Sequence, residues 1–453
     1  MAKVKSKYVC QGCGYETAGY LGKCPECGAW SSFVEEVVGS DAKANIDLPD
    51  KNPPMKLSEI EMNTEIRTST GISEFDRVLG GGIVQGSLVL IAGDPGIGKS
   101  TILLQTSGEL CKSNKKVLYV SAEESASQIK LRAERLQVKS DNLYIYPQTN
   151  FELIKKHIEE MKPDLVIVDS IQAIYTSAIQ SSAGSVSQIR ECCNSLMSLA
   201  KTNNVSIIVI GHVTKEGNIA GPKVLEHMVD TVIQFEGDKY KTYRILRSIK
   251  NRFGNTSEVG IFEMGAKGLS EVLNPSELFL KEYSQTQTPG STIIVTSEGT
   301  RPLLVEIQAL VGTTPYPTPR RVANGVDVSR VLQILAVLEK RIGLNLSKQD
   351  VYVNVIGGID VSEPAADLGI ALAIITCVRD VVFDSHTAIV GEIGLSGEIR
   401  AVNHIDKRIN EAQKLGFKRI IIPASNEIQD DIKGIEVLKV QRIIEAITRA
   451  VSK

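Results

Sequence analysis

Residues 87–101 read SLVLIAGDPGIGKST, an apolar run that breaks into glycines and ends on a lysine and two hydroxyls. The segment GDPGIGKS fits the pattern G-x-x-x-x-G-K-[ST] at every fixed position, and that pattern is typical of a phosphate-binding loop between a strand and a helix. Its glycines let backbone N–H groups turn toward a phosphate, and the following helix directs the positive end of its dipole at the anion. Lys99 is expected to reach the β- and γ-phosphates, and Ser100 to hold Mg²⁺. The residues expected to contact the nucleotide are Gly93, Asp94, Pro95, Gly96, Ile97, Gly98, Lys99, Ser100 and Thr101.

Length and composition set the outer limits of the interpretation. A chain of 453 residues is too long for one hydrophobic core, so two or three domains are expected. The sequence contains neither a run of eighteen apolar residues nor a signal-peptide core, which predicts a soluble, cytoplasmic protein with no membrane segment. The formal net charge is only -2, so any binding of nucleic acid must come from local basic patches.

Four cysteines lie in one short cluster, CQGCGYETAGYLGKCPECG. Cys10 and Cys13 form one C-x-x-C knuckle and Cys24 and Cys27 form the other, each followed by a glycine that lets the backbone turn toward sulfur. Four thiolates suit a closed, tetrahedral structural Zn²⁺ site, whereas a catalytic zinc keeps an open position. A redox dithiol is the alternative, but two paired knuckles fit a metal better than one thioredoxin-like motif.

The pattern along the chain predicts four regions. Residues 1–35 are expected to form the zinc ribbon, 36–63 a polar linker, 64–272 a parallel α/β domain around the phosphate loop, and 286–453 a second domain. Strands of the α/β domain are predicted within residues 117–125, 142–147, 164–171, 205–213 and 231–237.

Two of these strand ends carry acidic residues. LVIVDS places Asp169 at the C-terminal tip of a buried strand, the usual position for an acid that holds the Mg²⁺ water shell beside a phosphate loop. YVSAEES places Glu123 and Glu124 at the tip of another strand, where a carboxylate can orient an attacking water. A strand-end cap is the alternative for Asp169, and a capping or solvated role is the alternative for either glutamate.

Together the phosphate loop, the glutamate at a strand end, VDS and IVIGHVTKEG resemble a RecA-type ATPase core. The four-cysteine ribbon, GGGIVQGSLVLIAGDPGIGKST and KNRFG at 250–254 narrow the resemblance to the bacterial RadA/Sms family of recombination proteins, over nearly the whole chain. The resemblance implies that Glu123, rather than Glu124, activates water and that His212 senses the γ-phosphate and signals to the loop VTKEGNIAGPKVLEH that follows. It also implies ATP, Mg²⁺ and Zn²⁺ as ligands, a ring that is a hexamer, single-stranded and branched DNA as substrates, and the RecA recombinase as a partner.

Every charged residue from Lys239 to Arg252 is basic, which predicts contact with phosphate of DNA or of a neighbouring subunit's ATP. The resemblance makes Lys250 and Arg252 of KNRFG fingers that act in trans, although contact with DNA in cis stays open. A solvated basic face is the alternative for the outer members of the run, such as Lys239 and Lys241. The candidate DNA contacts are Lys215, Lys223, Arg244 and Arg247.

Residues 176–189, TSAIQSSAGSVSQI, lack charge and are rich in serine and alanine. Their composition predicts a flexible loop. RecA-like proteins place a channel-facing loop here, so contact with DNA is a second interpretation.

The second domain carries EIQALV, PRR, VNVIGG, EPAADLGIA and GEIGLSGEIRAV, which resemble the proteolytic α+β domain of Lon. The positions that match the Ser-Lys dyad of that family hold Ala365 and Asp406, so peptidase chemistry is not expected. Ser362 and Lys407 lie close by in sequence, and a shifted dyad would require them to meet at hydrogen-bond distance.

These observations predict a RecA-like P-loop ATPase with an N-terminal zinc ribbon and a C-terminal Lon-like domain. The expected activity is DNA-dependent ATP hydrolysis by a helicase-like ring motor that processes recombination intermediates and promotes branch migration in DNA repair. Two other functions are considered: an ATP-dependent peptidase, and a nucleotide-switched DNA-binding module that does not hydrolyse ATP. The ATPase rate with and without single-stranded DNA separates the three.

Overall fold

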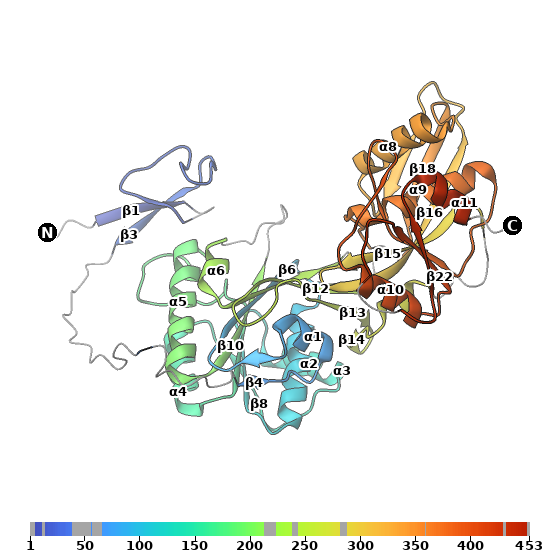
Figure 1. Ribbon diagram of the computed structural model, residues 1–453. Helices are drawn as coiled ribbons and strands as arrows, with labels where there is room; N and C mark the ends of the chain where they lie inside the picture. Colours follow the sequence, from blue (N-terminus) through green and yellow to red (C-terminus); the bar gives the residue numbers. More distant parts are fainter. Residues whose placement is uncertain are drawn as a thin grey trace. The chain divides into compact units, whose positions relative to one another are not determined.

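The computed structural model describes residues 5–10, 14–38, 56, 66–212, 223–237, 243–280, 288–357, 359–428 and 432–450 (Figure 1). The chain divides into two compact units, Met1–Val272 and Leu273–Lys453. Within the described ranges, no helix is both long enough and apolar enough to cross a membrane.

The N-terminal ribbon is a small antiparallel sheet of strand order β2-β1-β3. Strand β1 (Lys5–Cys10) pairs with both β2 (Glu16–Thr17) and β3 (Phe33–Val38). Because β3 continues to Val38, the ribbon extends past the predicted boundary at residue 35. Most of the predicted linker, 39–55 and 57–63, lies outside the described residues.

A nine-stranded sheet of order β14-β13-β12-β11-β6-β10-β9-β7-β8 forms the centre of the first unit (Figure 1). Six of its strands run parallel, as their registers show. They are β6 (Leu88–Gly93), β7 (Val117–Ser121), β8 (Leu143–Pro147), β9 (Leu165–Asp169), β10 (Ser206–His212) and β11 (Thr231–Glu236). The five strands predicted after the phosphate loop are therefore confirmed.

The sheet is not parallel throughout, as the sequence had led us to expect. Strands β12 (Tyr243–Asn251), β13 (Val259–Gly265) and β14 (Gly268–Glu271) extend it as an antiparallel meander beyond β11. Short connections explain the change of direction, because a turn of a few residues joins antiparallel strands whereas a parallel pair needs a long crossover. A two-stranded ribbon of β4 (Arg67–Thr68) and β5 (Ile83–Val84) precedes the sheet.

Helices supply the apolar layers on the two faces of the sheet. Side chains alternate along β6, so Val89 and Ile91 join one core with α1, α2 and α3, while Leu88 and Leu90 join another with α4 and α5. The helices are α1 (Ser73–Leu79), α2 (Lys99–Lys112), α3 (Ala126–Arg135), α4 (Phe151–Met161), α5 (Val186–Asn203) and α6 (Lys223–Met228). Polar side chains fix their starts: Ser125 and Gln128 form a capping box on α3, and Ser185 caps α5.

The second unit contains a seven-stranded mixed sheet of order β17-β18-β16-β15-β19-β22-β23. Its strands are β15 (Ser291–Glu298), β16 (Arg301–Thr313), β17 (Arg321–Asn324), β18 (Gln349–Val355), β19 (Thr387–Ile389), β22 (Arg419–Pro423) and β23 (Glu436–Val440). A short pair, β20 (Glu392–Ile393) and β21 (Ile399–Arg400), lies outside this sheet. The helices are α7 (Pro275–Phe279), α8 (Val328–Val337), α9 (Asp367–Arg379), α10 (Ile405–Lys414) and α11 (Ile443–Ala450).

The second unit begins at Leu273, earlier than the predicted residue 286. Its first helix, α7, is held by Ser276, whose Oγ accepts a hydrogen bond from Leu304 N on β16 at 3.1 Å. The same hydroxyl donates to Glu411 Oε1 at 3.3 Å. These bonds connect residues far apart in sequence, which local patterns do not reveal.

Candidate active site

The phosphate loop follows β6 and needs glycine for two different reasons. Gly93, Gly96 and Gly98 all have positive φ, at 156°, 79° and 122°. A Cβ at Gly93 would lie 2.7 Å from Phe235 O, so the backbone excludes a side chain there. At Gly98 a Cβ would lie 2.8 Å from Met264 Cε, the movable end of a flexible side chain, and the positive φ adds to the preference for glycine. Gly96 has open space around it, and there backbone conformation alone favours glycine. The helix α2 begins directly after Gly98 with no acidic residue in its first turn, which leaves its N-terminal N–H groups available to an anion.

Lys99 is buried beneath this loop, with only 4% of its surface exposed. Its Nζ donates to Gly93 O at 2.7 Å and to Asp94 O at 2.9 Å. Burial lowers the pKa of Lys99 to about 8, and the carboxylates of Asp169, Asp94 and Glu123 oppose this shift. A phosphate anion would restore the pKa, because it stabilises the charged ammonium.

A cavity of about 490 Å³ opens over the loop. Every sequence-predicted catalytic residue outside KNRFG lines it: Lys99, Glu123, Asp169 and His212. The remaining lining residues are Pro95, Gly96, Gly98, Ser100, Thr101, Ser121, Glu124, Arg132, Arg135, Arg244 and Met264. The carboxyl ends of parallel strands meet at this edge, which explains why residues distant in sequence converge here.

Asp169 and Ser100 provide the oxygen donors that Mg²⁺ prefers, and both line the cavity. The Asp169 carboxylate is nearly buried and accepts a hydrogen bond from Tyr119 OH at 2.6 Å. Burial and the neighbouring Asp169 charge raise the pKa of Tyr119, so the phenol stays protonated and keeps donating this bond. One Asp169 oxygen is thus oriented by the core, and the residues present fit a magnesium ion bound together with a nucleotide.

The structure separates the two adjacent glutamates. The Glu124 carboxylate forms an ion pair with Arg132 of α3. The Glu123 carboxylate accepts a hydrogen bond from Ser170 Oγ and lies 3.2 Å from His212 Nε2, and 46% of its side chain is exposed. Glu123 is therefore the more exposed of the two carboxylates, at 46% against 33%, and it contacts the residue expected to sense the γ-phosphate.

Arg244, which was predicted to contact DNA, lines this cavity in the structure. It is 7% exposed, its Nε donates to Ile97 O at 3.2 Å, and its Nη1 donates to Tyr243 O at 2.8 Å. The strand β12 directs alternate side chains to opposite faces, so the members of the basic run have different surroundings. Arg132, Arg135 and Met264 were not predicted, although the two arginines lie one helical turn apart on α3, the helix that follows the EES segment.

KNRFG lies at the amino-terminal ends of the parallel strands, whereas the phosphate loop lies at their carboxyl ends. Thr231 pairs with both Val89 and Asn251, whereas Phe235 pairs with Gly93. The strand β6 from Leu88 to Gly93 separates the two edges, and its five residue steps span roughly 16 Å. KNRFG therefore does not contact the phosphate loop of its own subunit.

The other candidate DNA contacts have mixed outcomes. Lys215 lies outside the described residues, as do Lys239 and Lys241. Lys223 is the first residue of α6. Arg247 forms an ion pair with Glu236, with Nε to Oε2 at 3.3 Å, and 30% of its side chain is exposed. DNA contact by Lys223 and Arg247 stays a prediction.

The uncharged loop after β9 is more ordered than its composition predicts. Gln188 of α5 is buried beneath it, and its Nε2 donates to the carbonyls of Thr176, Ile179 and Ser181 at 3.0–3.2 Å. The Thr176 amide donates back to Gln188 Oε1 at 2.9 Å. One glutamine thus holds the loop through four hydrogen bonds, which no local pattern in the sequence indicates.

The cysteine cluster has the geometry of a metal site. The Sγ atoms of Cys10, Cys24 and Cys27 lie within 4.8 Å of one another, and Cys10 and Cys27 are 3.7 Å apart. Four sulfurs at the usual Zn–S distance of about 2.3 Å would be separated by about 3.8 Å in a tetrahedron. The two knuckles repeat the same hydrogen bond, from Gly14 N to Cys10 O and from Gly28 N to Cys24 O. Cys13 lies outside the described residues.

In the second unit, the positions that match a peptidase dyad carry no such chemistry. Ala365 is 4% exposed, and its carbonyl accepts a hydrogen bond from Gly391 N at 2.8 Å. Asp406 lies in the first turn of α10. A cavity of about 270 Å³ is lined by Ser362, Glu363, Arg330 and Asp367 among others, and Lys407 is not among its lining residues. The shifted dyad of Ser362 and Lys407 therefore has no shared site in the described structure.

Comparison with known families and proteins agrees with this division. Residues 68–270 match the KaiC ATPase family, residues 8–35 a rubredoxin-type metal-binding domain, and residues 326–426 the ChlI subunit of Mg-chelatase. The chain is 53% identical to DNA repair protein RadA of Bacillus subtilis, over 99% of both chains. It is 52% identical to the proteins of that name from Listeria monocytogenes, over 99% of both, and Streptococcus pyogenes serotype M1, over the full length of both. The C-terminal match is to ChlI, so the Lon-like interpretation of that unit rests on its sequence pattern.

Proposed function

This chain belongs to the RadA family of DNA repair proteins, and from that premise we propose that it is a Mg²⁺-requiring, DNA-dependent ATPase that acts as a ring-shaped, helicase-like motor. In this proposal the motor moves along single-stranded DNA in the cytoplasm, processes branched recombination intermediates and promotes branch migration beside the RecA recombinase. The observation that carries the proposal is the convergence of Lys99, Glu123, Asp169 and His212 on one cavity over the phosphate loop.

The protein side of the reaction follows from these residues. The ammonium of Lys99 exchanges its bonds to loop carbonyls for bonds to the β- and γ-phosphates, where it stabilises negative charge. Ser100 and Asp169 would hold Mg²⁺, which would neutralise phosphate charge. The exposed carboxylate of Glu123 orients the attacking water, and its contact with His212 gives the γ-phosphate a route to the segment after β10.

The position of KNRFG supports a role across a subunit interface. KNRFG lies too far from the phosphate loop of its own chain to contact a nucleotide bound there. A nucleotide bound to a neighbouring subunit is therefore the ATP that it could reach. Arg252 is the better candidate for a finger, since 55% of its side chain is exposed. An arginine supplied in trans to a transferring phosphoryl group commonly raises the rate by about 10³-fold or more. A closed ring, which we infer to be a hexamer, would give every loop such a partner.

A mixing experiment tests this function. Arg252→Ala and Lys99→Ala are each expected to hydrolyse ATP poorly, whereas their mixture under subunit exchange should regain DNA-stimulated activity. In a mixed ring, some interfaces join the intact phosphate loop of an Arg252→Ala subunit to the intact Arg252 of a Lys99→Ala subunit. Lys99→Ala mixed with Glu123→Gln is the matched control, because both changes disable the same side of the interface and should give no rescue. A mixture of the first pair that stays inactive, together with weaker DNA binding by Arg252→Ala, would place KNRFG on DNA in cis.

Neither alternative function has an observation in its favour. The buried Ala365 and the separate positions of Ser362 and Lys407 speak against a peptidase. A non-hydrolysing switch would leave the exposed Glu123 without a task. A parental ATPase rate that is zero with and without single-stranded DNA would favour the switch.

A further inference from the structure

The two cations of KNRFG differ in how many of their hydrogen-bond donors are in use. Lys250 Nζ donates to Glu226 O at 2.8 Å, His227 O at 3.2 Å and Val229 O at 2.9 Å, at the end of α6. An ammonium group has three donors, so all of them serve these carbonyls. Arg252 has one side-chain bond in the described structure, from Nη1 to Asp230 Oδ1 at 3.3 Å. In this arrangement Arg252, and not Lys250, has donors left for a ligand.

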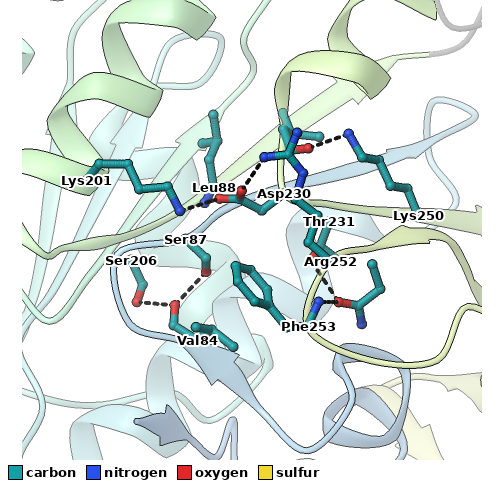
Figure 2. A network of polar contacts seen from close by, with 12 residues as sticks. Val84, Ser87, Leu88, Lys201, Ser206, Asp230, Thr231, Lys250, Arg252 and Phe253 are labelled. Carbon is teal, nitrogen blue, oxygen red and sulfur yellow. Dashed lines mark hydrogen bonds and ion pairs between the residues drawn. The ribbon is translucent and has the colours of Figure 1, made fainter. Parts of the chain in front are cut away.

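Asp230 is the group that holds Arg252, and Figure 2 shows the network around it. Its side chain is only 2% exposed. Oδ2 accepts hydrogen bonds from Lys201 Nζ at 3.0 Å and from Leu88 N, at the start of β6, at 3.1 Å. Among the described residues, Lys201 and Arg252 are the side-chain cations that bond this carboxylate, and each binds a different oxygen (Figure 2).

Lys201 and Arg252 approach Asp230 from the surface, with 50% and 55% of their side chains exposed. Lys201 comes from the last turn of α5, and its Nζ also lies 5.7 Å from the centre of the Phe253 ring. The backbone of Arg252 is fixed separately, because its N–H donates to Asp230 O at 3.1 Å. The guanidinium can therefore swing away from Asp230 while its main chain stays in place.

A swing of this kind faces an electrostatic obstacle. When Arg252 leaves for an outside phosphate, a buried carboxylate loses a counter-charge, and an uncompensated buried charge is strongly unfavourable. Lys201 and the Leu88 amide stay bonded to the other oxygen, so Asp230 remains neutralised. We propose that Lys201 is a positioning residue that makes Arg252 exchangeable between Asp230 and the phosphates of a neighbouring subunit's nucleotide. This inference rests on the proposed role of Arg252 in trans.

The proposal predicts a specific pattern of single and double variants. In Lys201→Met, Arg252 becomes the one cation bonded to Asp230 and is held there, so kcat for ATP should fall about tenfold while KM changes less than about twofold. Lys201→Arg should stay within about twofold of the parent, because it keeps the charge. Adding Asp230→Asn to Lys201→Met removes the charge that traps Arg252 and should restore kcat to within about threefold of the parent.

Three measurements decide between a positioning role and a merely structural one. The first is the kcat and KM of each variant. The second is rescue of Lys201→Met by Lys99→Ala in mixed rings, which is expected because the defect lies on the finger side of the interface. The third is the midpoint of urea unfolding, which should be close to the parental value. Lys115→Met is the matched control, since Lys115 pairs with Asp164 on the surface, at 3.1 Å, and should retain parental kinetics.

The outcomes separate failure of this inference from failure of the proposed function. If Arg252→Ala and Lys99→Ala rescue each other but Lys201→Met hydrolyses ATP at the parental rate, the finger stands and the role of Lys201 is wrong. A Lys201→Met defect that Asp230→Asn does not suppress, or a Lys201→Met chain that fails to fold, would show a structural role and also overturn the inference. If the first mixture shows no rescue, the trans function itself fails.

Discussion

Buried charges occur in both units of this protein, but their bonding differs. In the nucleotide cavity Lys99 donates to two carbonyls of a loop that a phosphate would contact, and Glu123 keeps nearly half of its surface in solvent. In the second unit Arg408 binds Glu363 through two hydrogen bonds of 2.7 and 2.8 Å, and Arg330 binds Asp367 through two of 2.7 and 2.6 Å. Lys99 and Glu123 are bonded in ways that a ligand can replace, whereas these charges of the second unit bond one another.

The contrast is informative because the sequence pattern of the second unit predicts a Lon-like domain, while the positions of the dyad hold Ala365 and Asp406. Arg408 is 2% exposed and also donates to the carbonyls of Val295 and Asn403, so four of its five N–H donors are engaged. Paired charges of this kind stabilise one arrangement of a core, and they leave no group available for chemistry. A buried ionisable residue is therefore evidence for a reaction site only when its bonds can be exchanged.

The strongest test of this contrast removes the cavity's buried ammonium. Lys99→Ala should lower ATP hydrolysis by about 10³-fold or more, because the phosphates lose their main side-chain cation. A steady-state ATPase assay checks this, and the unfolding midpoint should stay near the parental value. Hydrolysis at the parental rate would show that the assigned cavity is not the active site.

A second test compares the two adjacent glutamates. Glu123→Gln should bind ATP normally and hydrolyse it at least about 100-fold more slowly, since only the orientation of water is affected. Glu124→Gln is the matched control, because its carboxylate is already paired with Arg132, and its rate should change by less than about tenfold. Equilibrium binding and single-turnover hydrolysis separate the two effects. The opposite ranking would transfer the catalytic role to Glu124.

In the second unit the same kind of change should affect stability and leave basal ATPase activity intact. Arg330→Met removes the partner of Asp367, whose side chain is 2% exposed, and should cost about 2–3 kcal/mol of unfolding free energy. Arg400→Met is the control, because Arg400 and its partner Glu398 are both exposed. Denaturant unfolding of the full chain measures both. An equal effect of the two changes would refute the structural role of the buried pair.

This stability loss should depend on pH with a definite sign. Burial raises the pKa of Asp367, and its bond to Arg330 opposes the shift. A folded-state pKa above the unfolded value means that the folded state binds the proton more tightly, so stability increases as pH falls through the folded pKa. Arg330→Met should therefore recover part of its lost stability in acid, and unfolding curves at neutral and acidic pH check this.

The smallest expected effect concerns the pH dependence of ATP binding. With a pKa of about 8 in the free protein, Lys99 loses its proton as pH rises from 7 to 9, whereas bound phosphate favours the protonated form. ATP affinity should fall about tenfold over this range, as expected for the loss of one proton at that pKa. In Lys99→Arg the guanidinium keeps its charge, so binding should be nearly independent of pH. Titration with a fluorescent nucleotide analogue measures both, and a flat parental profile would contradict the assignment.

Short-range patterns were sufficient for much of this protein. GDPGIGKST predicted the loop, its strand and its helix, because the glycines act through backbone conformation and the lysine through its fixed spacing. The acids Asp169 and Glu123 were found for a related reason, since the carboxyl ends of parallel strands share one edge. The two cysteine knuckles were predictable as well, because the hydrogen bond that closes each of them joins residues within a five-residue segment.

Other features depend on contacts between residues far apart in sequence, and only the tertiary structure decided them. Arg244 and Arg252 look equivalent in a basic run, but β12 carries one into the cavity and the other to the opposite edge, beside a buried Asp230. The boundary at Leu273 and the loop held by Gln188 also depend on contacts between residues that local sequence patterns do not reveal. The sequence specifies which charged residues exist. Their burial and their hydrogen-bond partners determine which of them a ligand can still reach, and burial and partners are set only when the strands assemble into a sheet.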